Sequence, residues 1–419
     1  MTTTTTATDT LSAQRVWDRC EALARLSEMD GGLTRVFLSK EQRLANDLVL
    51  GWMREAGMTA RLDAIGNCVG RYEGERPGLP CLMLGSHLDT VRDAGKYDGM
   101  LGVVVGIECV ASLNARGIRL PFAIEVVGFA DEEGVRFNAT LLGSRAVAGT
   151  FKLETLAATD REGVTMTQAL ERFGLNPAAI PKAARRRSEV LAYAELHIEQ
   201  GPVLEAERLP VCVVTAISGA TRYAVEIEGL AGHAGTVPMT LRQDALAAAA
   251  ECVLEVERIA RRTRDLVGTV GKLEALPGAV NTVPGRVRLT LDIRSPYDSV
   301  RQEAVMDILG AFAEIGERRK VKITANKTHE GRTAPCAEWL MDQMAEAVAA
   351  EGIAVRELAS GAGHDGMAMI ELTDIAMLFV RCEKGISHNP AEAITLADVE
   401  TGARVFLRFI ERFDPKRKR

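Results

Sequence analysis

The stretch that most restricts the fold is an apolar run ending in ionisable side chains, Leu82-Met-Leu-Gly-Ser-His87-Leu-Asp89-Thr-Val91. It predicts a buried strand, and because residues two apart on a strand share a face, His87 and Asp89 point the same way. Asp98 follows eleven positions after His87, where an apolar segment over 100–115 predicts a helix. An imidazole with a carboxylate beside it is how proteins build a metal ligand and its supporting partner. The stretch therefore predicts one half of a metal centre.

Two further strands are expected, over 122–129 and 191–196, and each runs into polar residues. The first is followed by Asp131-Glu132-Glu133 and the second by His197-Ile-Glu199-Gln200. Strands that alternate with helices indicate an α/β layered domain. Because active sites of such sheets collect at the carboxyl ends of the strands, these side chains are expected to lie near one another.

After residue 215 the pattern changes to strand, helix, two strands, helix and strand, the order of a split, ferredoxin-like α+β module. The expected strands span 222–228, 266–276, 286–294 and 321–327, and the helices span 242–262 and 300–318. We therefore expect a first part of a catalytic domain over 1–215, an inserted domain over 216–330, and the second part of the catalytic domain over 331–419. The edge strands of the inserted sheet are candidates for pairing with a second subunit.

The chain has six histidines, and five of them lie in expected loops or at strand ends rich in glycine or acids. A single histidine is more often a hydrogen-bonded structural residue, but several at strand ends beside carboxylates favour a metal site. The candidate donors are His87, Asp98, Glu133, His197 and His388. This set offers nitrogen and oxygen without sulfur, which suits Zn²⁺, Mn²⁺, Ni²⁺ or Co²⁺, and one carboxylate could bridge two ions.

The adjacent acids Glu132 and Glu133 could divide the work of a hydrolase, one binding metal and its neighbour acting as general base. Alone, two acids after a strand are usually a solvated turn. A serine triad is disfavoured because Ser86 points away from its neighbours on the strand and no G-x-S-x-G elbow is present. A cysteine nucleophile is disfavoured because no cysteine sits in a loop with polar partners.

Composition excludes several classes of protein. The formal net charge is −6, whereas nucleic-acid-binding proteins are more often basic, and the basic runs over 185–187 and 417–419 are interpreted as solvated surface and tail. Eight cysteines without CxxC spacing indicate buried, reduced thiols and a cytoplasmic protein. No apolar run is long enough to span a membrane. The Thr-rich first ten residues lack the pattern of a signal peptide and are expected to be a disordered tail.

Nine motifs, in this order, give the chain a resemblance to a known family: GSHLDTV, KYDG, ADEEGVRF, AELHIEQGP, GHAGT, AVNTVPG, DIR, SGAGHD and ISHNPAE. Together they resemble the amidase, hydantoinase/carbamoylase branch of the aminoacylase-carboxypeptidase dinuclear metallohydrolases, which includes allantoate amidohydrolases and N-carbamoyl-L-amino-acid hydrolases. AELHIEQGP separates this branch from its peptidase relatives, which usually carry a carboxylate where His197 stands. The resemblance runs from about residue 15 to the end, but none of its motifs covers 155–187.

The resemblance implies a mixed-sheet α/β catalytic domain that holds two divalent ions per subunit, Zn²⁺ or Mn²⁺, with Ni²⁺ and Co²⁺ as alternatives. His87, Asp98 and Glu133 would hold one metal, with His197 and His388 completing the pair, and Asp98 would bridge. Of the three catalytic residues implied, Glu132 would be the general base, Asp89 would orient His87, and His233 would polarise the scissile carbonyl in the partner subunit's active site.

The resemblance also implies a substrate-binding set of Gln200, Asn281, Arg294 and the loop that holds Gly361, Gly363 and His364. Arg294 would take the substrate carboxylate, and the loop would contribute backbone donors. The inserted domain would be a lid over the site and the contact of a homodimer.

The activity implied is hydrolysis of a linear amide or ureido C–N bond in a small carboxylate substrate, with release of ammonia and CO₂ from N-carbamoyl products. Allantoate and N-carbamoyl-L-amino acids are both candidates, and the FADEEGVRF stretch leans towards allantoate. One alternative is a dipeptidase or aminoacylase on the same scaffold. The other is a dimeric small-molecule binding protein with a vestigial site.

Overall fold

The computed structural model describes residues 11–418, so the predicted N-terminal tail lies outside the described residues. The chain forms two compact units. Unit 1 runs to Thr215 and resumes over Cys336–Leu358 and Ala362–Arg419, and unit 2 comprises Ala216–Pro335 and Ala359–Gly361.

A nine-stranded mixed sheet is centred on unit 1, in the order β1-β2-β4-β3-β5-β16-β6-β14, with β15 pairing β6. Its strands are β1 (Thr59–Leu62), β2 (Cys68–Tyr72), β3 (Cys81–His87), β4 (Ala123–Phe129), β5 (Val190–Ile198), β6 (Val211–Ile217), β14 (Ala334–Pro335), β15 (Glu357–Ser360) and β16 (Ile375–Val380). The central strands β4, β3, β5 and β16 run parallel. All residues of β3, β4 and β16 are buried, as expected for parallel strands covered on both faces. The mixed α/β class predicted from the sequence is confirmed.

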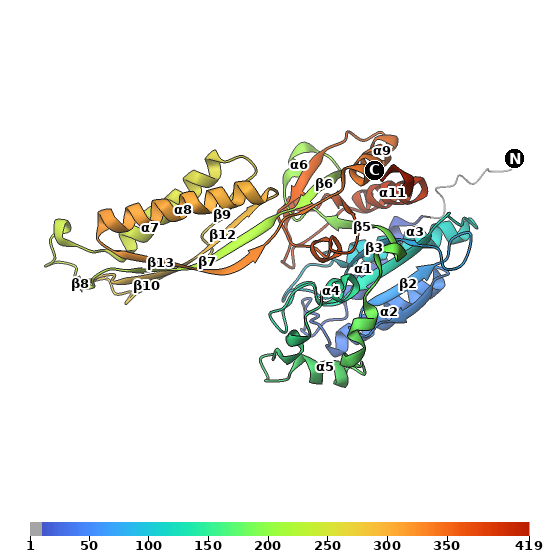
Figure 1. Cartoon of the computed structure of the whole chain (residues 1–419), viewed down its shortest axis with the longest axis horizontal. Helices are drawn as coiled ribbons and strands as arrows, with labels where there is room; N and C mark the ends of the chain where they lie inside the picture. The colour runs from blue at the N-terminus through green and yellow to red at the C-terminus, as the bar shows by residue number, and fades with distance from the viewer. Residues whose placement is uncertain (1–10, 419) are drawn as a thin grey trace. The chain divides into compact units, whose positions relative to one another are not determined.

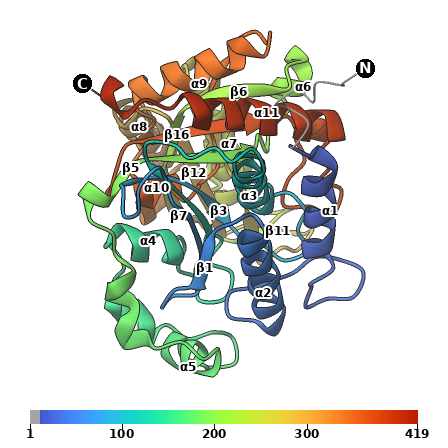
Figure 2. The same cartoon turned by 90° about the vertical axis from the view of Figure 1, so that its right-hand side faces the viewer.

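Helices cover both faces of this sheet, with α2 and α3 on one side and α4 on the other (Figures 1 and 2). One large apolar core joins the sheet to α1 (Ala13–Ala24), α2 (Lys40–Glu55), α3 (Met100–Ala115), α9 (Glu338–Ala350) and α11 (Leu396–Arg412). A smaller core holds α4 (Leu142–Ala148) and α5 (Met166–Arg172), and two short helices, α6 (Val203–Glu207) and α10 (Gly366–Met369), complete the unit. The helix predicted over 100–115 is α3, whose bounds agree with the prediction. Its apolar residues are buried on all sides of the helix, as is typical of a helix inside a core.

Unit 2 is an antiparallel sheet in the order β10-β12-β7-β13, with two long helices on one face (Figure 1). Its elements are β7 (Gly219–Glu228), β8 (Gly232–His233), α7 (Ala245–Arg262), β9 (Val267–Thr269), β10 (Leu273–Leu276), β11 (Thr282–Val283), β12 (Arg286–Ser295), α8 (Asp298–Arg319) and β13 (Lys322–Gly331). Along β12, Val287, Leu289 and Leu291 are buried towards the helices, whereas Arg288 and Thr290 are exposed on the other face. Alternation of this kind is typical of a sheet with one open face.

Two strand predictions in unit 2 were wrong in their extent. The strand predicted over 266–276 is divided into β9 and β10, because the partner register on β12 shifts by one residue between Thr269↔Asp292 and Leu273↔Leu289. Such a shift is a β-bulge, which inserts an extra residue without ending the alternation of apolar side chains. The strand predicted over 321–327 continues to Gly331 through a second shift after Lys327.

The basic run over 185–187 is only partly the solvated surface that was predicted. Arg185 forms an ion pair with the buried carboxylate of Glu125 at 2.8 Å, whereas the Arg187 side chain is 68% exposed. The expectation of buried, reduced thiols is confirmed, since all eight cysteines are free and buried. Between residues 11 and 418 there is no helix of the length and apolarity needed to cross a membrane.

Candidate metal centre

Asp98 lies in the loop between β3 and α3, at the carboxyl edge of the parallel strands. The backbone N–H groups of Tyr97 and Asp98 donate to Oε1 of Glu392, at 2.8 and 3.1 Å, which fixes this loop. The next residue, Gly99, has a φ of +74°, and a Cβ atom there would lie 2.4 Å from the His87 ring. Glycine is therefore required for Asp98 and His87 to approach each other.

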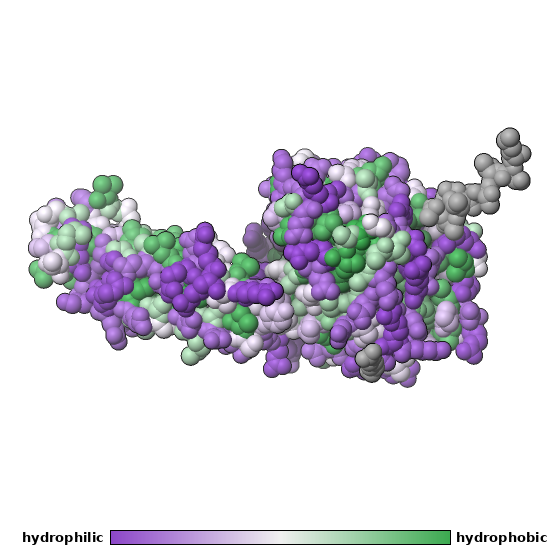
Figure 3. All heavy atoms as spheres, turned by 90° about the horizontal axis from the view of Figure 1, so that it is seen from above, coloured by the Kyte–Doolittle hydropathy of each residue, from purple (hydrophilic) through white to green (hydrophobic). Residues whose placement is uncertain are grey.

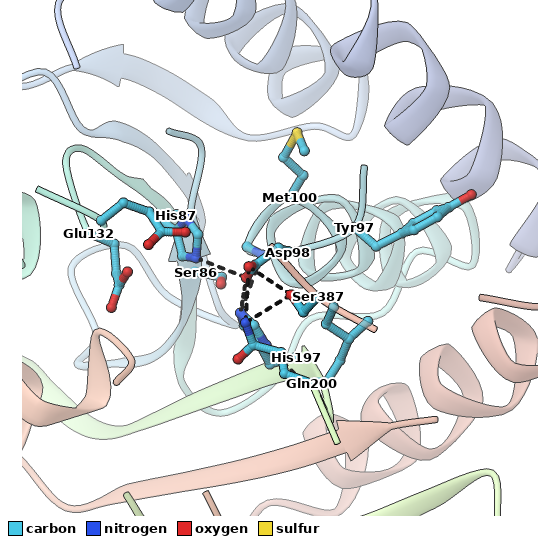
Figure 4. Close-up of polar contacts among 12 residues, drawn as sticks. Ser86, His87, Tyr97, Asp98, Met100, Glu132, His197, Gln200 and Ser387 are labelled. Carbon is cyan, nitrogen blue, oxygen red and sulfur yellow. Dashed lines mark hydrogen bonds and ion pairs between the residues drawn. The ribbon is translucent and has the colours of Figure 1, made fainter. Parts of the chain in front are cut away.

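Three imidazoles and a second carboxylate surround Asp98, which lies at the centre of the labelled residues in Figure 4. Nε2 of His197 lies 3.1 Å and Nε2 of His87 lies 3.6 Å from Oδ1 of Asp98. Nε2 of His388 lies 3.2 Å from Oδ2 of Asp98 and 3.5 Å from Oε1 of Glu133. Each carboxylate oxygen of Asp98 therefore faces its own donor group, which is the geometry of a bridging carboxylate. His87 and His197 face Oδ1, and His388, which also contacts Glu133, faces Oδ2; ligand atoms of His87, Glu132 and Glu133 also lie within 4.8 Å of one another, so the implied grouping of His87 with Glu133 stays a prediction.

The tautomers of His87 and His197 can be read from their Nδ1 contacts. Nδ1 of His87 lies 3.0 Å from the carbonyl oxygen of Asp89, and Nδ1 of His197 lies 2.9 Å from that of Ile198. Because a carbonyl only accepts, each Nδ1 carries the proton and each Nε2 presents a lone pair. The Nε2 atom of His197 also accepts the N–H of Gly99 at 3.3 Å, but a lone pair facing a carboxylate oxygen is repulsive unless a proton or a metal ion lies between them. The donor set therefore fits divalent metal ions bound through Nε2 and carboxylate oxygen.

Burial and mutual charge shift the pKa values of this cluster. Burial opposes ionisation of Asp98, but hydrogen bonds from His197, His388 and His87 hold its pKa well below the ordinary value. Burial would lower the pKa of His87, but Asp98 and Glu132 raise it well above the ordinary value. Burial raises the pKa of Glu133 to about 7. Protons and metal ions therefore compete for the same donor atoms.

The carboxylate of Asp89 positions the two adjacent acids. Its Oδ1 accepts the N–H of Glu132 at 3.0 Å, and its Oδ2 accepts the N–H of Glu133 at 3.1 Å. Nδ1 of His87 lies 3.9 Å from Oδ1 of Asp89, so Asp89 contacts the imidazole through its main-chain carbonyl instead. Asp131, which precedes the acids, has a φ of +56°. A non-glycine residue in this region is strained, a condition found most often at functional sites.

Glu132 is 8% exposed and lies beside His87 (Figure 4). A ligand atom of Glu132 lies within 4.8 Å of those of His87 and Glu133. Burial raises its pKa well above the ordinary value, and the charges of Glu133 and Asp365 add to the shift. A carboxylate with a raised pKa beside a metal centre can accept and hold a proton near neutral pH.

Gln200 and Ser387 contact the metal centre from the side of His388. The amide nitrogen of Gln200 donates to Oδ2 of Asp98 at 3.0 Å and to Oγ of Ser387 at 3.1 Å. Oε1 of Gln200 is buried and has no hydrogen-bond partner among residues 11–418, so it is the atom that Gln200 can offer to a substrate. Gln200 and His388 both have positive φ, at 56° and 53°.

Two residues that support the centre were not identified from the sequence. Glu392, 4% exposed, holds the Asp98 loop, and its place inside the ISHNPAE motif is a signal that could have found it. Arg35 is fully buried and donates to the carbonyl oxygens of Leu88 at 2.9 Å and Leu23 at 2.7 Å. It fixes the strand end between His87 and Asp89, and burial lowers its pKa to about 10. No local pattern marks Arg35, because its partners are distant in sequence.

The remaining predicted residues are divided between the units. His364 is buried in unit 1, with its ring centroid 4.4 Å from that of His197, and burial lowers its pKa well below the ordinary value. Gly363 also belongs to unit 1. The predicted residues of unit 2 are His233, Asn281, Arg294 and Gly361.

Two of the residues in unit 2 have defined hydrogen-bond partners. Nδ1 of His233, which is exposed, accepts the N–H of Gly235 at 3.1 Å. Arg294 donates from Nε and Nη2 to Asp292, at 2.9 Å each, and from Nη1 to the carbonyl oxygen of Gly361 at 2.7 Å. The His233 ring therefore carries its proton on Nε2, and the guanidinium of Arg294 is held in one orientation.

Several known proteins are similar to this chain in sequence or in structure. Residues 83–412 match the sequence profile described as Peptidase family M20/M25/M40. The chain is 42% identical to the N-carbamoyl-L-amino acid amidohydrolase of Geobacillus stearothermophilus over 94% of its own length and 97% of that protein. It is 40% identical to a probable allantoate deiminase of Oryza sativa subsp. japonica over 94% and 87% of the two chains. The crystal structure of an amidase of the hydantoinase/carbamoylase family from Burkholderia multivorans superposes with a TM-score of 0.90, at 33% identity over 96% of this chain and 97% of that one.

Proposed function

The chain belongs to Peptidase family M20/M25/M40, and on that premise we propose that it hydrolyses a linear amide or ureido C–N bond in a small carboxylate substrate. The substrate is allantoate or an N-carbamoyl-L-amino acid, as the names of the relatives suggest. The observation that carries the proposal is the geometry of Asp98, whose Oδ1 faces His87 and His197 and whose Oδ2 faces His388, with Glu132 near the same cluster. The carbamic acid formed by hydrolysis of a ureido group would decay to ammonia and CO₂.

Two divalent ions, Zn²⁺ or Mn²⁺ with Ni²⁺ and Co²⁺ as alternatives, would supply Lewis acidity that lowers the pKa of water and polarises the carbonyl. His87, His197, His388, Asp98 and Glu133 would hold them. Glu132 takes the proton of the attacking water and passes it to the leaving nitrogen, a role for which its raised pKa suits it. Asp89 keeps Glu132 in reach through the backbone.

Two of the side chains proposed to bind substrate, Arg294 and Gln200, have hydrogen-bonding groups to offer it. Because Asp292 and Gly361 use three of the five N–H groups of Arg294, two remain to bind the substrate carboxylate as a fork. Gln200 offers Oε1, and the substrate would also contact Asn281, Gly363 and His364.

A homodimer is proposed to complete the site. His233 has its Nδ1 engaged by Gly235, so Nε2–H is free to donate to the oxygen of a scissile carbonyl. His233 would do so in the partner subunit's active site, with unit 2 as both the lid and the dimer contact. Exposed apolar side chains near β8 and β11 support such a contact, since exposed apolar patches mark interaction sites. They are Leu230, Met239, Leu241 and Val280, and Figure 3 shows apolar surface on this end of unit 2.

The proposed location is the cytoplasm, because eight buried free thiols suit a reducing compartment. No nucleic acid or membrane partner is proposed.

The test is a substrate panel on protein reconstituted separately with each metal ion. Allantoate, N-carbamoyl-L-amino acids, N-acetyl-L-amino acids and dipeptides would be compared by kcat/KM. The proposal expects ammonia release from the ureido substrates and little turnover of the others. Higher kcat/KM on dipeptides or N-acyl amino acids would favour a dipeptidase or aminoacylase instead. Metal binding without turnover of any substrate would favour a binding protein with a vestigial site.

A further inference from the structure

A polar hollow of about 460 Å³ lies in unit 1, at the edge of the sheet opposite the metal centre. Its lining includes Cys81 and Val190, the first residues of β3 and β5, and Glu125 of β4. β3 carries His87 at its other end, six residues away, and at about 3.3 Å per residue this puts the hollow roughly 20 Å from the metal ligands. The hollow is therefore separate from the proposed active site.

Arginines dominate the lining of the hollow. Four guanidinium groups, those of Arg61, Arg71, Arg185 and Arg186, line it together with two carboxylates, those of Glu125 and Glu189. This gathering of positive charge occurs in a chain of net charge −6. Two of the four arginines come from strands β1 and β2, and the other two lie in the segment 155–187, which none of the motifs covers.

Glu125 fixes two of the guanidinium groups. It is 2% exposed, and its Oε1 accepts from Nη1 of Arg71 at 3.1 Å while its Oε2 accepts from Nη2 of Arg185 at 2.8 Å. Arg71 also donates to Glu73 from Nε and Nη2 and to the carbonyl oxygen of Leu79 from Nη2, which leaves one N–H on Nη1. Arg186 is paired with Glu189 at 2.7 Å. Held in place by a buried carboxylate, Arg71 and Arg185 lose little further freedom when they bind a ligand.

Two cations are left over after this pairing. Within residues 11–418, the side chains of Arg61 and Lys182 have no hydrogen bond or ion pair, and both line an adjoining cavity of about 230 Å³ that Arg185 also borders. Asp63 also lines that cavity and Glu73 pairs with Arg71, so the surplus is about one positive charge, next to guanidinium groups that are already oriented. Ser188 adds a hydroxyl to the lining of the larger hollow.

We propose that this hollow is a binding site for a phosphate-type dianion, either free phosphate or the phosphate group of a metabolite. Arg61 supplies the unpaired charge, and Arg185 and Arg71 supply oriented N–H donors. Guanidinium groups match the geometry of phosphate oxygens and bind them through paired hydrogen bonds. A phosphate anion would also balance the surplus positive charge.

The test is calorimetric titration of the metal-loaded, full-length protein with orthophosphate, in buffers matched in ionic strength with NaCl. Arg61→Gln should weaken phosphate binding at this site by about tenfold or more, the effect of losing a hydrogen bond between charged groups. Because the Arg61 side chain is exposed and has no hydrogen bond or ion pair within residues 11–418, this variant should remain folded. Arg185→Gln should weaken binding as well. The matched control is Arg187→Gln, since Arg187 is exposed and does not line the hollow, and its isotherm should equal that of the wild type.

Phosphate could also bind at the metal ions, and the variants separate the two sites. Identical isotherms for wild type, Arg61→Gln and Arg185→Gln would assign all binding to the metal ions and overturn the proposal. Absence of phosphate binding to the wild type would overturn it too. A parallel titration with glycerol 3-phosphate distinguishes the sources: tighter binding than orthophosphate indicates a phosphorylated metabolite, and weaker binding indicates free phosphate.

Discussion

The two edges of the sheet in unit 1 both bury carboxylates, but they balance the charge in different ways. At the amino edge, Glu125 lies between Arg71 and Arg185, whose guanidinium groups are permanently charged. At the carboxyl edge, Asp98 lies among imidazoles whose Nδ1 protons are engaged by main-chain carbonyls. An arginine beside a buried carboxylate balances its negative charge permanently. Neutral imidazoles beside a carboxylate do not, so the charge of Asp98 has to be balanced by ions that bind. This difference indicates that the proposed chemistry takes place at the carboxyl edge.

The largest effect on activity is expected from Glu132→Gln. The amide cannot accept a proton, so kcat should fall by roughly 10²- to 10⁴-fold, the usual contribution of a general base. Metal content should stay at the wild-type level, because Glu132 is not one of the proposed ligands. The matched comparison is Glu133→Gln, which should lose metal as well as activity. Near-normal turnover by Glu132→Gln would remove this residue from the role of base.

A substitution at the amino edge of the sheet should lower the free energy of unfolding. Glu125→Gln leaves two guanidinium groups without their buried partner, and breaking such a pair typically costs about 3 kcal/mol of unfolding free energy. Urea denaturation of variant and wild type would measure the loss, and elemental analysis should show unchanged metal content. Loss of metal from this variant would contradict the distinction between the two edges.

Asp89→Asn should have an intermediate effect on the carboxyl edge. The amide group can accept only one of the two N–H bonds from Glu132 and Glu133, so the acids are held less firmly. Residues that orient metal ligands typically contribute 10- to 100-fold to metal affinity or activity, and kcat should fall by about that factor. The control is Asp93→Asn, since Asp93 is exposed on the loop that follows. Equal activity of the two variants would show that the Asp89 carboxylate has no positioning role.

The smallest effect expected is a change with pH in how much bound metal stabilises the folded chain. After metal is removed with a chelator, the folded chain retains protons that the unfolded chain releases, because Glu133 has its pKa raised to about 7 and His87 has its pKa raised above the ordinary value. Because the unfolded chain releases these protons at lower pH than the folded chain does, the folded metal-free chain becomes less stable as pH rises from about 5 to about 7.5.

Bound metal replaces those protons, so the gain in Tm on adding metal should grow with pH over this range. Differential scanning calorimetry at pH 5.5 and pH 7.5, with and without metal, measures this gain. A gain that is larger at pH 5.5 would contradict the proton-metal competition inferred for the donor set.

The sequence predicted the parts of the site that depend on local pattern. His87, Glu133 and His197 follow buried apolar runs, and the rule that parallel strands end at one edge is enough to bring them together. His388 lies in a loop, and its place beside Asp98 came from the resemblance rather than from any periodicity.

The parts that were missed depend on contacts between distant segments. Arg35 reaches Leu88 and Leu23 only in the folded chain, so no spacing reveals it. The division of donors between the two oxygens of Asp98 depends on ring orientation, which the carbonyls of Asp89 and Ile198 set. The bulge that separates β9 from β10 preserves the apolar alternation, so the pattern alone predicts one strand.

The most direct test of the account is the metal content of purified wild type and Asp98→Asn, measured by inductively coupled plasma mass spectrometry with circular dichroism as the check on folding. If Asp98 bridges two ions, the wild type should hold about two divalent ions per chain and the folded variant fewer than one. A folded Asp98→Asn chain that retains both ions would contradict the account.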